Sequence, residues 1–273
     1  MSSRRVLPLT YLVVIVAVGV TVVPLLFVFV DGFRSTAQIN SSPAGLPHPW
    51  VWSNYGAILT SAPFWQFLGN STLIAVVATG LAVGFGSTAA FALSRYVFRG
   101  REAIYTLFVA GLLFPLGVAA LPLYLLLERA GLLDNQLGVA IPEGAFQLSI
   151  TIVILRPFMR GIPSEIEDAA IVDGASRFRF FLKILVPLSR PALVTVALLA
   201  FVLSWNQYLL PLLVFTTESH YTLPLGVATY QSTYSQNTGS ILAFTALSMI
   251  PALAFFLLAE SQLVGGVTGA VKG

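Results

Sequence analysis

Long apolar segments alternate with short polar ones along the chain, and this alternation is its main structural signal. Six apolar segments each reach about the 20 residues with which a helix crosses about 30 Å of hydrocarbon. They are Leu7–Val30, Ser71–Leu93, Ala103–Leu127, Leu137–Phe158, Ala192–Phe215 and Ser240–Ala259. The fourth is the least apolar, because it contains Pro142, Glu143 and Gln147. The pattern predicts an all-α polytopic membrane protein with six transmembrane helices.

The first segment follows Arg4 and Arg5 and therefore shares one feature with a secretion signal. Its apolar run of about 23 residues is longer than the roughly 7–15 residues of a signal peptide. Val30-Asp31-Gly32 is also a poor cleavage site. We expect a retained membrane helix.

The positive charges predict the orientation of the chain. If the N-terminus is cytoplasmic, all of the 14 Lys and Arg residues except Arg34 and Arg129 lie in cytoplasmic segments. Such an asymmetry is typical of the cytoplasmic side of membrane proteins. We therefore expect both termini and the loop 160–190 to be cytoplasmic.

Composition excludes several classes of protein. The chain is 57% hydrophobic and 9% charged, whereas soluble domains carry about 25% charged residues. It has no cysteine, which rules out disulfide scaffolds and thiol catalysis. The two histidines, His48 and His220, lie far apart in predicted loops, so solvated side chains are favoured over a metal pair.

The predicted outer loop Asp31–Leu68 is rich in proline and aromatic residues. Such residues are typical of an interfacial belt with short surface helices. A docking surface for an external binding protein is the alternative interpretation.

One charged element, Glu165–Ala175, stands between the fourth and fifth apolar segments. Ser164 and Glu167 have the spacing of a capping box, and acidic residues in the first turn suit the helix dipole. Gly174 stands where helices commonly end. The pattern predicts a helix of about two turns outside the membrane, and Ala169, Ala170 and Val172 suit a shallow socket on another protein.

A second short helix should follow, with Ser176 as its N-cap. Its charges are Arg177, Arg179 and Lys183, and its apolar face is Phe178, Phe180 and Phe181. This combination is typical of a helix lying at the membrane interface. Pro187 and Pro191 should break it before the fifth span.

These two elements together resemble the EAA loop of ABC-importer permeases. The loop's pattern stands here as Asp168-Ala169-Ala170, then Gly174, then Ile184-Leu185-Val186-Pro187, with the family spacing kept. Asp168 replaces the usual Glu, and Val186 replaces Leu. The shorter carboxylate puts the strength of one expected salt bridge in doubt.

Two further motifs resemble the carbohydrate branch of these permeases, specifically the second permease subunit of the maltose type. They are Trp205-Asn206-Gln207 and the tail Gly269-Ala270-Val271-Lys272-Gly273. The resemblance covers about residues 65–273. It implies three regions: a helix with an outer loop (1–64), a type I ABC permease core that includes the EAA loop (65–262), and a cytoplasmic tail (263–273).

The resemblance also implies partners in a bacterial plasma membrane. The chain would form half of a heterodimeric pore with a second six-helix permease, above two ATPase subunits and below an extracytoplasmic solute-binding protein. No nucleic acid is expected. The residues that would contact the ATPases are Glu165, Glu167, Asp168, Ala169, Ala170, Asp173, Gly174, Ala175 and Pro187 in the loop, with Lys272 and Gly273 in the tail.

The chain contains no Walker Gly-Lys-Ser/Thr loop, so it cannot hold ATP itself. We expect a transport subunit, not an enzyme, with no bound cofactor or metal; ATP and Mg²⁺ would belong to the partner ATPases. Polar residues in the spans could line a pore or hydrogen-bond between helices. They are Trp205, Asn206, Gln207, Tyr208, Thr245 and Ser248.

Two other functions compete with ATP-driven import of a sugar or sugar derivative. The first is an ion- or proton-coupled carrier, which usually needs an ionisable group within the membrane. Glu143 and Glu260 should lie near span ends, which argues against it. The second is a membrane scaffold that transports nothing. The sequence does not distinguish mono-, di- or oligosaccharides from a polyol phosphate.

Overall fold

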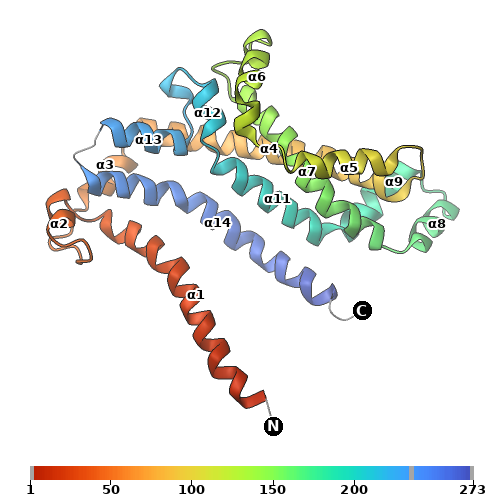
Figure 1. Cartoon of the computed structure of the whole chain (residues 1–273), viewed down its shortest axis with the longest axis horizontal. Helices are drawn as coiled ribbons and strands as arrows, with labels where there is room; N and C mark the ends of the chain where they lie inside the picture. The colour runs from red at the N-terminus through yellow and green to blue at the C-terminus, as the bar shows by residue number, and fades with distance from the viewer. Residues whose placement is uncertain (1–2, 234–236, 271–273) are drawn as a thin grey trace. The chain divides into compact units, whose positions relative to one another are not determined.

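The computed structural model describes residues 3–233 and 237–270, and every regular element in these ranges is a helix. The longer helices are α1 (Ser3–Asp31), α4 (Ala62–Arg95), α5 (Arg101–Gly111), α6 (Leu116–Arg129), α7 (Gln136–Gly161), α11 (Arg190–Trp205), α13 (Leu223–Thr233) and α14 (Thr238–Ala270). The shorter ones are α2 (Thr36–Ser41), α3 (Ser53–Leu59), α8 (Ser164–Val172), α9 (Arg177–Phe180), the π-helix η1 (Phe181–Leu185), α10 (Val186–Leu188), α12 (Leu209–Val214) and the 3-10 helix η2 (Glu218–His220). Figure 1 traces them in chain order.

Two compact units make up the chain. The first consists of residues 1–65 and 225–250, and the second of residues 66–224 and 251–273. The second unit contains α5 to α12 and most of α4, so the charged loop and the motif Trp205-Asn206-Gln207 both belong to it.

Four helices of the described part are long and apolar enough to cross a membrane. They correspond to the first, second, fourth and sixth predicted segments. Two bent helix pairs bring the number of possible spans to six if each pair counts as one. An all-α membrane fold is therefore confirmed, while the number of six spans and the side of the termini stay predictions.

The third predicted segment, Ala103–Leu127, is not one straight helix. Helix α5 ends at Gly111, α6 begins at Leu116, and the two are bent by 100°. Pro115 precedes α6 with extended backbone. Because proline lacks an N–H and keeps the residue before it out of the helical region, the helix cannot continue through this point.

The fifth predicted segment, Ala192–Phe215, is also interrupted. Helix α11 ends at Trp205, and α12 starts only at Leu209. Pro211 explains the break, because in a continuous helix its ring would clash with the carbonyl of Gln207 four residues earlier. The Gln207 side chain instead accepts the backbone N–H groups of Tyr208 and Leu209.

The first unit is organised around Arg34, whose side chain is only 1% exposed. Its guanidinium pairs with Asp31 at 2.9 Å and donates to the Gln38 carbonyl at 2.7 Å. Asn54 donates to the carbonyls of Gly32 and Arg34. These bonds fold the outer segment after α1 into an ordered structure.

An aromatic cluster occupies the same segment. The Phe33 ring lies 4.7 Å from Trp52, 5.3 Å from Trp50 and 4.3 Å from Tyr55. The Tyr55 hydroxyl donates to the Phe29 carbonyl, and burial raises the pKa of Tyr55 to about 12. Both tryptophans remain exposed, so the two interpretations of the outer loop, interfacial belt or docking surface, both stay open.

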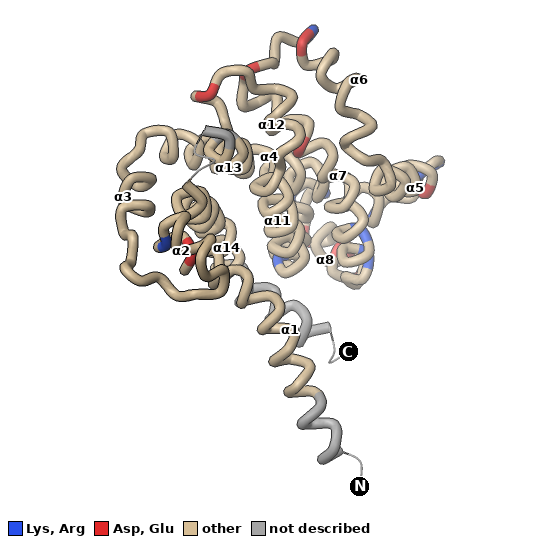
Figure 2. The backbone as a smooth tube through the Cα atoms, turned by 60° about the vertical axis from the view of Figure 1, so that its left-hand side comes forward, with Lys and Arg blue, Asp and Glu red and all other residues tan. Residues whose placement is uncertain are grey.

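Helix α7 is the centre of the second unit and packs against both α5 and α11. Arg156 of α7 is buried, pairs with Glu102 of α5, and stacks 3.9 Å from the Tyr105 ring centroid. A buried charge is tolerable only when it is paired and hydrogen-bonded in this way. Figure 2 shows that the charged residues of this unit lie mainly near helix ends and loops, many of them around α8.

His220 is not the freely solvated loop residue that the sequence predicts. Its Nδ1 lies 3.1 Å from an Asp134 carboxylate oxygen, and its side chain is only 33% exposed. Among the described residues, no group of three or more His, Asp and Glu side chains could hold a metal ion.

Candidate functional site

Helix α8 begins without the predicted capping box. Pro163, and not Ser164, occupies the N-cap position, and no side chain caps the helix there. The prediction fails by one residue because Pro163 takes an extended backbone (φ −54°, ψ 137°) and Ser164 becomes the first helical residue. Glu165 and Glu167 still lie in the first turn, where the helix dipole favours negative charge.

The carboxyl end of α8 confirms the predicted glycine stop. Gly174 has a φ of +79°, in the left-handed region that favours glycine. Its N–H donates to the Ile171 carbonyl at 2.9 Å, and the Ala175 N–H donates to the Ala170 carbonyl at 2.9 Å. This pair of bonds is a Schellman motif, which ends the helix abruptly and sets the direction of the following chain.

One face of α8 is exposed to solvent over its full length. Glu165, Asp168, Ala169 and Val172 have the i, i+3, i+4, i+7 spacing of a single helix face, and all four are exposed. Val172 at its end is 86% exposed. We call these four residues the outer stripe. An apolar residue this exposed on a helix that is anchored to its own chain by Ala170 and Glu167 suits contact with another protein.

The opposite face of α8 is held by the rest of the second unit. Ala170 is 6% exposed and packs in the core of the chain. Glu167 lies 3.7 Å from the Arg95 guanidinium, which also donates to the carbonyls of Met159 and Ile162 at 2.9 Å each. Arg95 therefore ties the end of α4 to the end of α7 and to α8.

The helix after α8 differs from its predicted role at the membrane interface. Ser176 caps it as predicted, since its side chain accepts the Arg179 N–H. Phe180 and Phe181, however, are buried in the protein core, where Phe181 stacks on Phe91 at 4.9 Å. The apolar face is explained by packing within the chain, and only Phe178 of the three phenylalanines is exposed.

Prolines separate this region from α11, near the predicted place. The segment Arg177–Leu188 and helix α11 are bent by 80°. Pro187 lies inside the short helix α10, and Pro191 lies in the first turn of α11. The bend is at Ser189, between the two prolines, so the helix breaks before the fifth span as predicted.

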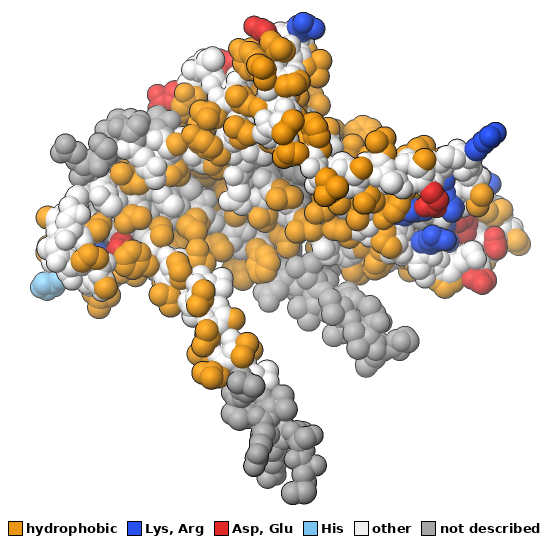
Figure 3. All heavy atoms as spheres, in the orientation of Figure 1, with side chains coloured by type: hydrophobic (Ala, Val, Ile, Leu, Met, Phe, Trp, Pro, Cys, Tyr) orange, Lys and Arg blue, Asp and Glu red, His pale blue; other side chains and the backbone are white. Residues whose placement is uncertain are grey.

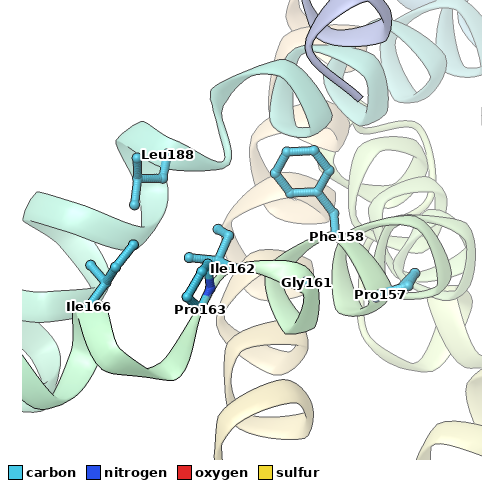
Figure 4. A pocket seen from close by; sticks show the side chains of 7 residues that line it. All are labelled: Pro157, Phe158, Gly161, Ile162, Pro163, Ile166 and Leu188. Atoms are coloured by element: carbon cyan, nitrogen blue, oxygen red, sulfur yellow. The ribbon is translucent and has the colours of Figure 1, made fainter. Parts of the chain in front are cut away.

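An open apolar hollow of about 470 Å³ lies beside α8. Ile166 and Leu188 form one side of it and Phe158 the other, with Pro163 between them (Figure 4). A second, more polar hollow of about 550 Å³ borders the acidic start of α8 and is lined by both acidic and basic side chains. Figure 3 shows charged side chains gathered at this end of the second unit.

The remaining loop residues are placed as follows. Asp173 is the C-cap of α8 and is exposed, whereas Ala175 is half-buried. The predicted tail contacts, Lys272 and Gly273, lie outside the described residues.

The six candidate pore residues are divided between the two units. Trp205 is buried and stacks on Phe201 at 5.5 Å. Asn206 and Tyr208 are exposed, and Gln207 lines a cavity. Thr245 and Ser248 belong to the first unit, where their hydroxyls donate to α14 carbonyls one turn earlier.

A buried polar cluster beside Gln207 was missed by sequence reasoning. Glu143 is 4% exposed and accepts a hydrogen bond from the Ser204 hydroxyl, and Gln147 is 7% exposed. Glu143 is the eighth residue of α7 and packs against the end of α11; its distance from the end of a membrane span stays a prediction. The i, i+4 spacing of Glu143 and Gln147 in an apolar segment was the available signal, because it puts both on one helix face. The side chain of Glu260 is not among those described.

Comparisons with known proteins agree with the fold. Residues 82–262 match the family described as "Binding-protein-dependent transport system inner membrane component". The chain is similar to the diacetylchitobiose uptake system permease protein NgcG of Streptomyces coelicolor, with 33% identity over 98% of this chain and 89% of that protein. It is also 34% identical to the trehalose transport system permease protein SugB of Mycobacterium tuberculosis, over the full length of both.

A solved structure has the same fold. It is the crystal structure of a bacterial ABC transporter involved in the import of the acidic polysaccharide alginate. A chain of it matches with a TM-score of 0.79 and 24% identity, over 96% of this chain and 98% of that one. These two sequence relatives are permease subunits, which are not themselves enzymes.

Proposed function

The chain belongs to the family of binding-protein-dependent transport system inner membrane components, and on this premise we propose that it is a permease subunit of an ATP-driven sugar importer. It forms half of the translocation pore and receives free energy from partner ATPases through the outer stripe of α8. A second permease subunit, two ATPases and an extracytoplasmic solute-binding protein complete the complex.

The observation that carries this proposal is the division of α8 into an exposed face and an anchored face. The outer stripe offers carboxylates at Glu165 and Asp168 and an exposed valine at Val172. The inner face is fixed by Arg95 and by Ala170 in the core. A helix held in this way moves with the helices beneath it, so a force on the outer stripe reaches α4 and α7.

Movement of a rigid element between two arrangements is a general means of coupling separate sites. Glu167 serves inside the chain in this proposal, since it faces Arg95. Asp168 is the carboxylate that faces the ATPase. The ATPase surface that meets the outer stripe is then positively charged.

Uptake by the whole complex in proteoliposomes tests the proposal. Val172→Asp should reduce ATP-dependent sugar uptake strongly, because a charge replaces the apolar contact. Val97→Asp is the matched control, since Val97 is 91% exposed on the α4–α5 connection and is not part of the stripe. Equal uptake by both variants, or uptake that persists with inactivated ATPases, would contradict the proposal.

The alternative of an ion- or proton-coupled carrier is not favoured by the family. The buried carboxylate of Glu143 is nevertheless a group that such carriers use, so the same vesicles should be treated with an uncoupler. Uptake that continues with ATP and an uncoupler present supports ATP-driven import, and uptake that collapses under these conditions supports the carrier.

A further inference from the structure

A cavity of about 250 Å³ lies inside the second unit, among the bend between α5 and α6, helix α7 and the end of α11. Its polar lining consists of Glu143, Gln147 and Gln207. Aromatic and aliphatic side chains form the rest of the wall, with Phe114 and Phe146 as the two rings. We call this cavity the Glu143 pocket.

Two of the residues that line the pocket carry a buried hydrogen-bond acceptor that no protein group satisfies. Ser204 donates to one oxygen of the Glu143 carboxyl group, and the other oxygen, Oε1, has no partner. The side-chain oxygen of Gln147 also has none. Buried polar atoms in native proteins are almost always hydrogen-bonded, so two unsatisfied acceptors on residues that line one cavity favour a ligand that donates hydrogen bonds.

Gln207 contributes from the third side. Its side-chain oxygen accepts the N–H groups of Tyr208 and Leu209, at 3.1 and 3.2 Å. The amide nitrogen therefore carries the hydrogen-bonding capacity that this side chain can offer to a ligand. The pocket combines acceptors on α7 with a donor after α11, which matches a hydroxyl group because it both donates and accepts.

The lining argues against an acidic ligand. None of the residues around the pocket is Lys, Arg or His, so nothing there would neutralise a carboxylate or a phosphate. Such groups also bring further acceptors to a place where the acceptors of Glu143 and Gln147 already lack a donor. The aromatic rings instead suit the apolar C–H faces of a sugar ring.

We propose that the Glu143 pocket is a subsite for a neutral, hydroxyl-bearing ring of the transported solute. This inference rests on the proposed function and names the substrate class of its pore. The volume is slightly below the roughly 300 Å³ at which small-molecule sites usually begin. The pocket therefore holds one ring of a larger sugar and rejects uronate or phosphate groups at that position.

The pocket and α8 can be perturbed separately. Both are attached to α7, but Gln147 stands fourteen residues before Gly161, the last residue of that helix. At 1.5 Å per residue this places the pocket about 20 Å along the helix from the connection to α8. Failure of the subsite and failure of the ATPase docking site thus give different results.

Cysteine protection tests the subsite without background from this chain, which has no cysteine. The Gln207→Cys variant, in the full complex in nanodiscs, is labelled with a small thiol reagent. The probes are a panel of neutral mono- and disaccharides that includes trehalose and diacetylchitobiose, and an alginate trisaccharide as the acidic comparison. Asn206→Cys is the matched control, because Asn206 is the exposed neighbour that does not line the pocket.

We expect at least one neutral sugar, at about twice its dissociation constant, to slow labelling of Gln207→Cys about threefold, because protection grows as one plus the ratio of sugar concentration to that constant. Asn206→Cys should not be slowed, and the acidic trisaccharide should protect neither variant. Absence of protection by the entire neutral panel, or equal protection by the acidic sugar, would overturn the inference.

A second variant separates binding from mere access. Gln147→Met, added to Gln207→Cys, removes the unsatisfied acceptor while nearly keeping side-chain length, and should raise the half-protecting sugar concentration about three- to tenfold. Leu148→Met in the same background is the control, and co-purification of the ATPases checks assembly. An unchanged half-protecting concentration would overturn the subsite. If that happens while Val172→Asp still uncouples uptake, the proposed function stands without it.

Discussion

Helix α8 and the Glu143 pocket lie toward opposite ends of α7, and they are built in opposite ways. The bonds that end α8 join residues at most five positions apart, as between Gly174 and Ile171 or Ala175 and Ala170. The pocket depends on residues far apart in sequence, such as Glu143 and Ser204, which are 61 positions apart. Local bonds specify where α8, the proposed docking element, ends, whereas tertiary packing specifies the pocket.

This difference has a functional consequence. An element defined by local bonds keeps its shape while the helices under it move, which suits a contact that transmits force. A pocket assembled from α5, α6, α7 and α11 changes shape when those helices shift, which suits a site that must release its ligand. Changes at α8 should therefore affect coupling, and changes around the pocket should affect binding or stability.

The largest effect is expected at Gly174. Gly174→Asp puts a side chain at a φ of +79° and adds a charge at the end of the docking helix. The left-handed conformation costs such a residue about 1–2 kcal/mol, and we expect uptake to fall about tenfold or more. Gly174→Asn is the control, because asparagine tolerates this conformation better. Equal loss in both variants would show that space, and not backbone conformation or charge, matters there.

Arg95→Gln should have the next largest effect. It removes the ion pair with Glu167 and the bonds to the carbonyls of Met159 and Ile162. Hydrogen bonds to charged groups contribute about 1.5–3 kcal/mol each, so amide exchange in α8 should become at least about tenfold faster by mass spectrometry. Arg99→Gln, at an exposed position nearby, should leave exchange unchanged. Unchanged exchange in Arg95→Gln would mean that α8 does not depend on this anchor.

A smaller effect is expected at Asp168. An exposed ion pair is worth about 0–1 kcal/mol, so Asp168→Ala should weaken association with the ATPases by no more than about fivefold. Asp168→Glu restores the carboxylate that is usual in the EAA loop and should bind at least as tightly as the natural chain. Quantitative co-purification measures both, and normal retention of the ATPases by Asp168→Ala would remove the proposed salt bridge.

The same contrast explains what the sequence could predict. Four membrane helices, the Gly174 stop and the Ser176 cap follow from periodicity and local signals, and all are confirmed. The same rules predict helix breaks near Pro115 and Pro211. Each break lies inside a long apolar run, and the length of the run alone favours one continuous helix. The role of Phe180 was misjudged because an apolar residue looks the same whether it faces lipid or the protein's own core.

The local pattern puts Glu143 and Gln147 on one helix face but does not determine whether that face is buried. A carboxylate seven residues from the start of α7 can face a loop or the helix interior, depending on what packs against it. Its hydrogen bond from Ser204 depends on the packing of α11 against α7. The role of residues that depend on such packing can be assigned only from the three-dimensional structure.

The smallest effect should come from Asp134, in the connection between α6 and α7, and it tests whether distant contacts stabilise the region beside the pocket. Its carboxylate accepts hydrogen bonds from the Thr217 hydroxyl and from the N–H groups of Thr217 and Thr216. These bonds, led by that of the Thr217 hydroxyl, hold the pKa of Asp134 well below its usual range. A carboxyl group whose pKa falls on folding stabilises the folded state above the unfolded pKa of about 4, and this contribution is lost as the pH falls toward the folded pKa.

Asp134→Asn isolates the charge, because asparagine accepts the φ of 54° found at this position. At neutral pH the variant should unfold at a slightly lower temperature than the natural chain, and the difference should shrink as the pH is lowered below about 4. Thermal unfolding of the complex in detergent at a series of pH values measures this. A difference that stays constant into acid would mean that the carboxylate acts only through its shape. The connection would then be held by local backbone preference, as the Gly174 end of α8 is, and not by long-range charge.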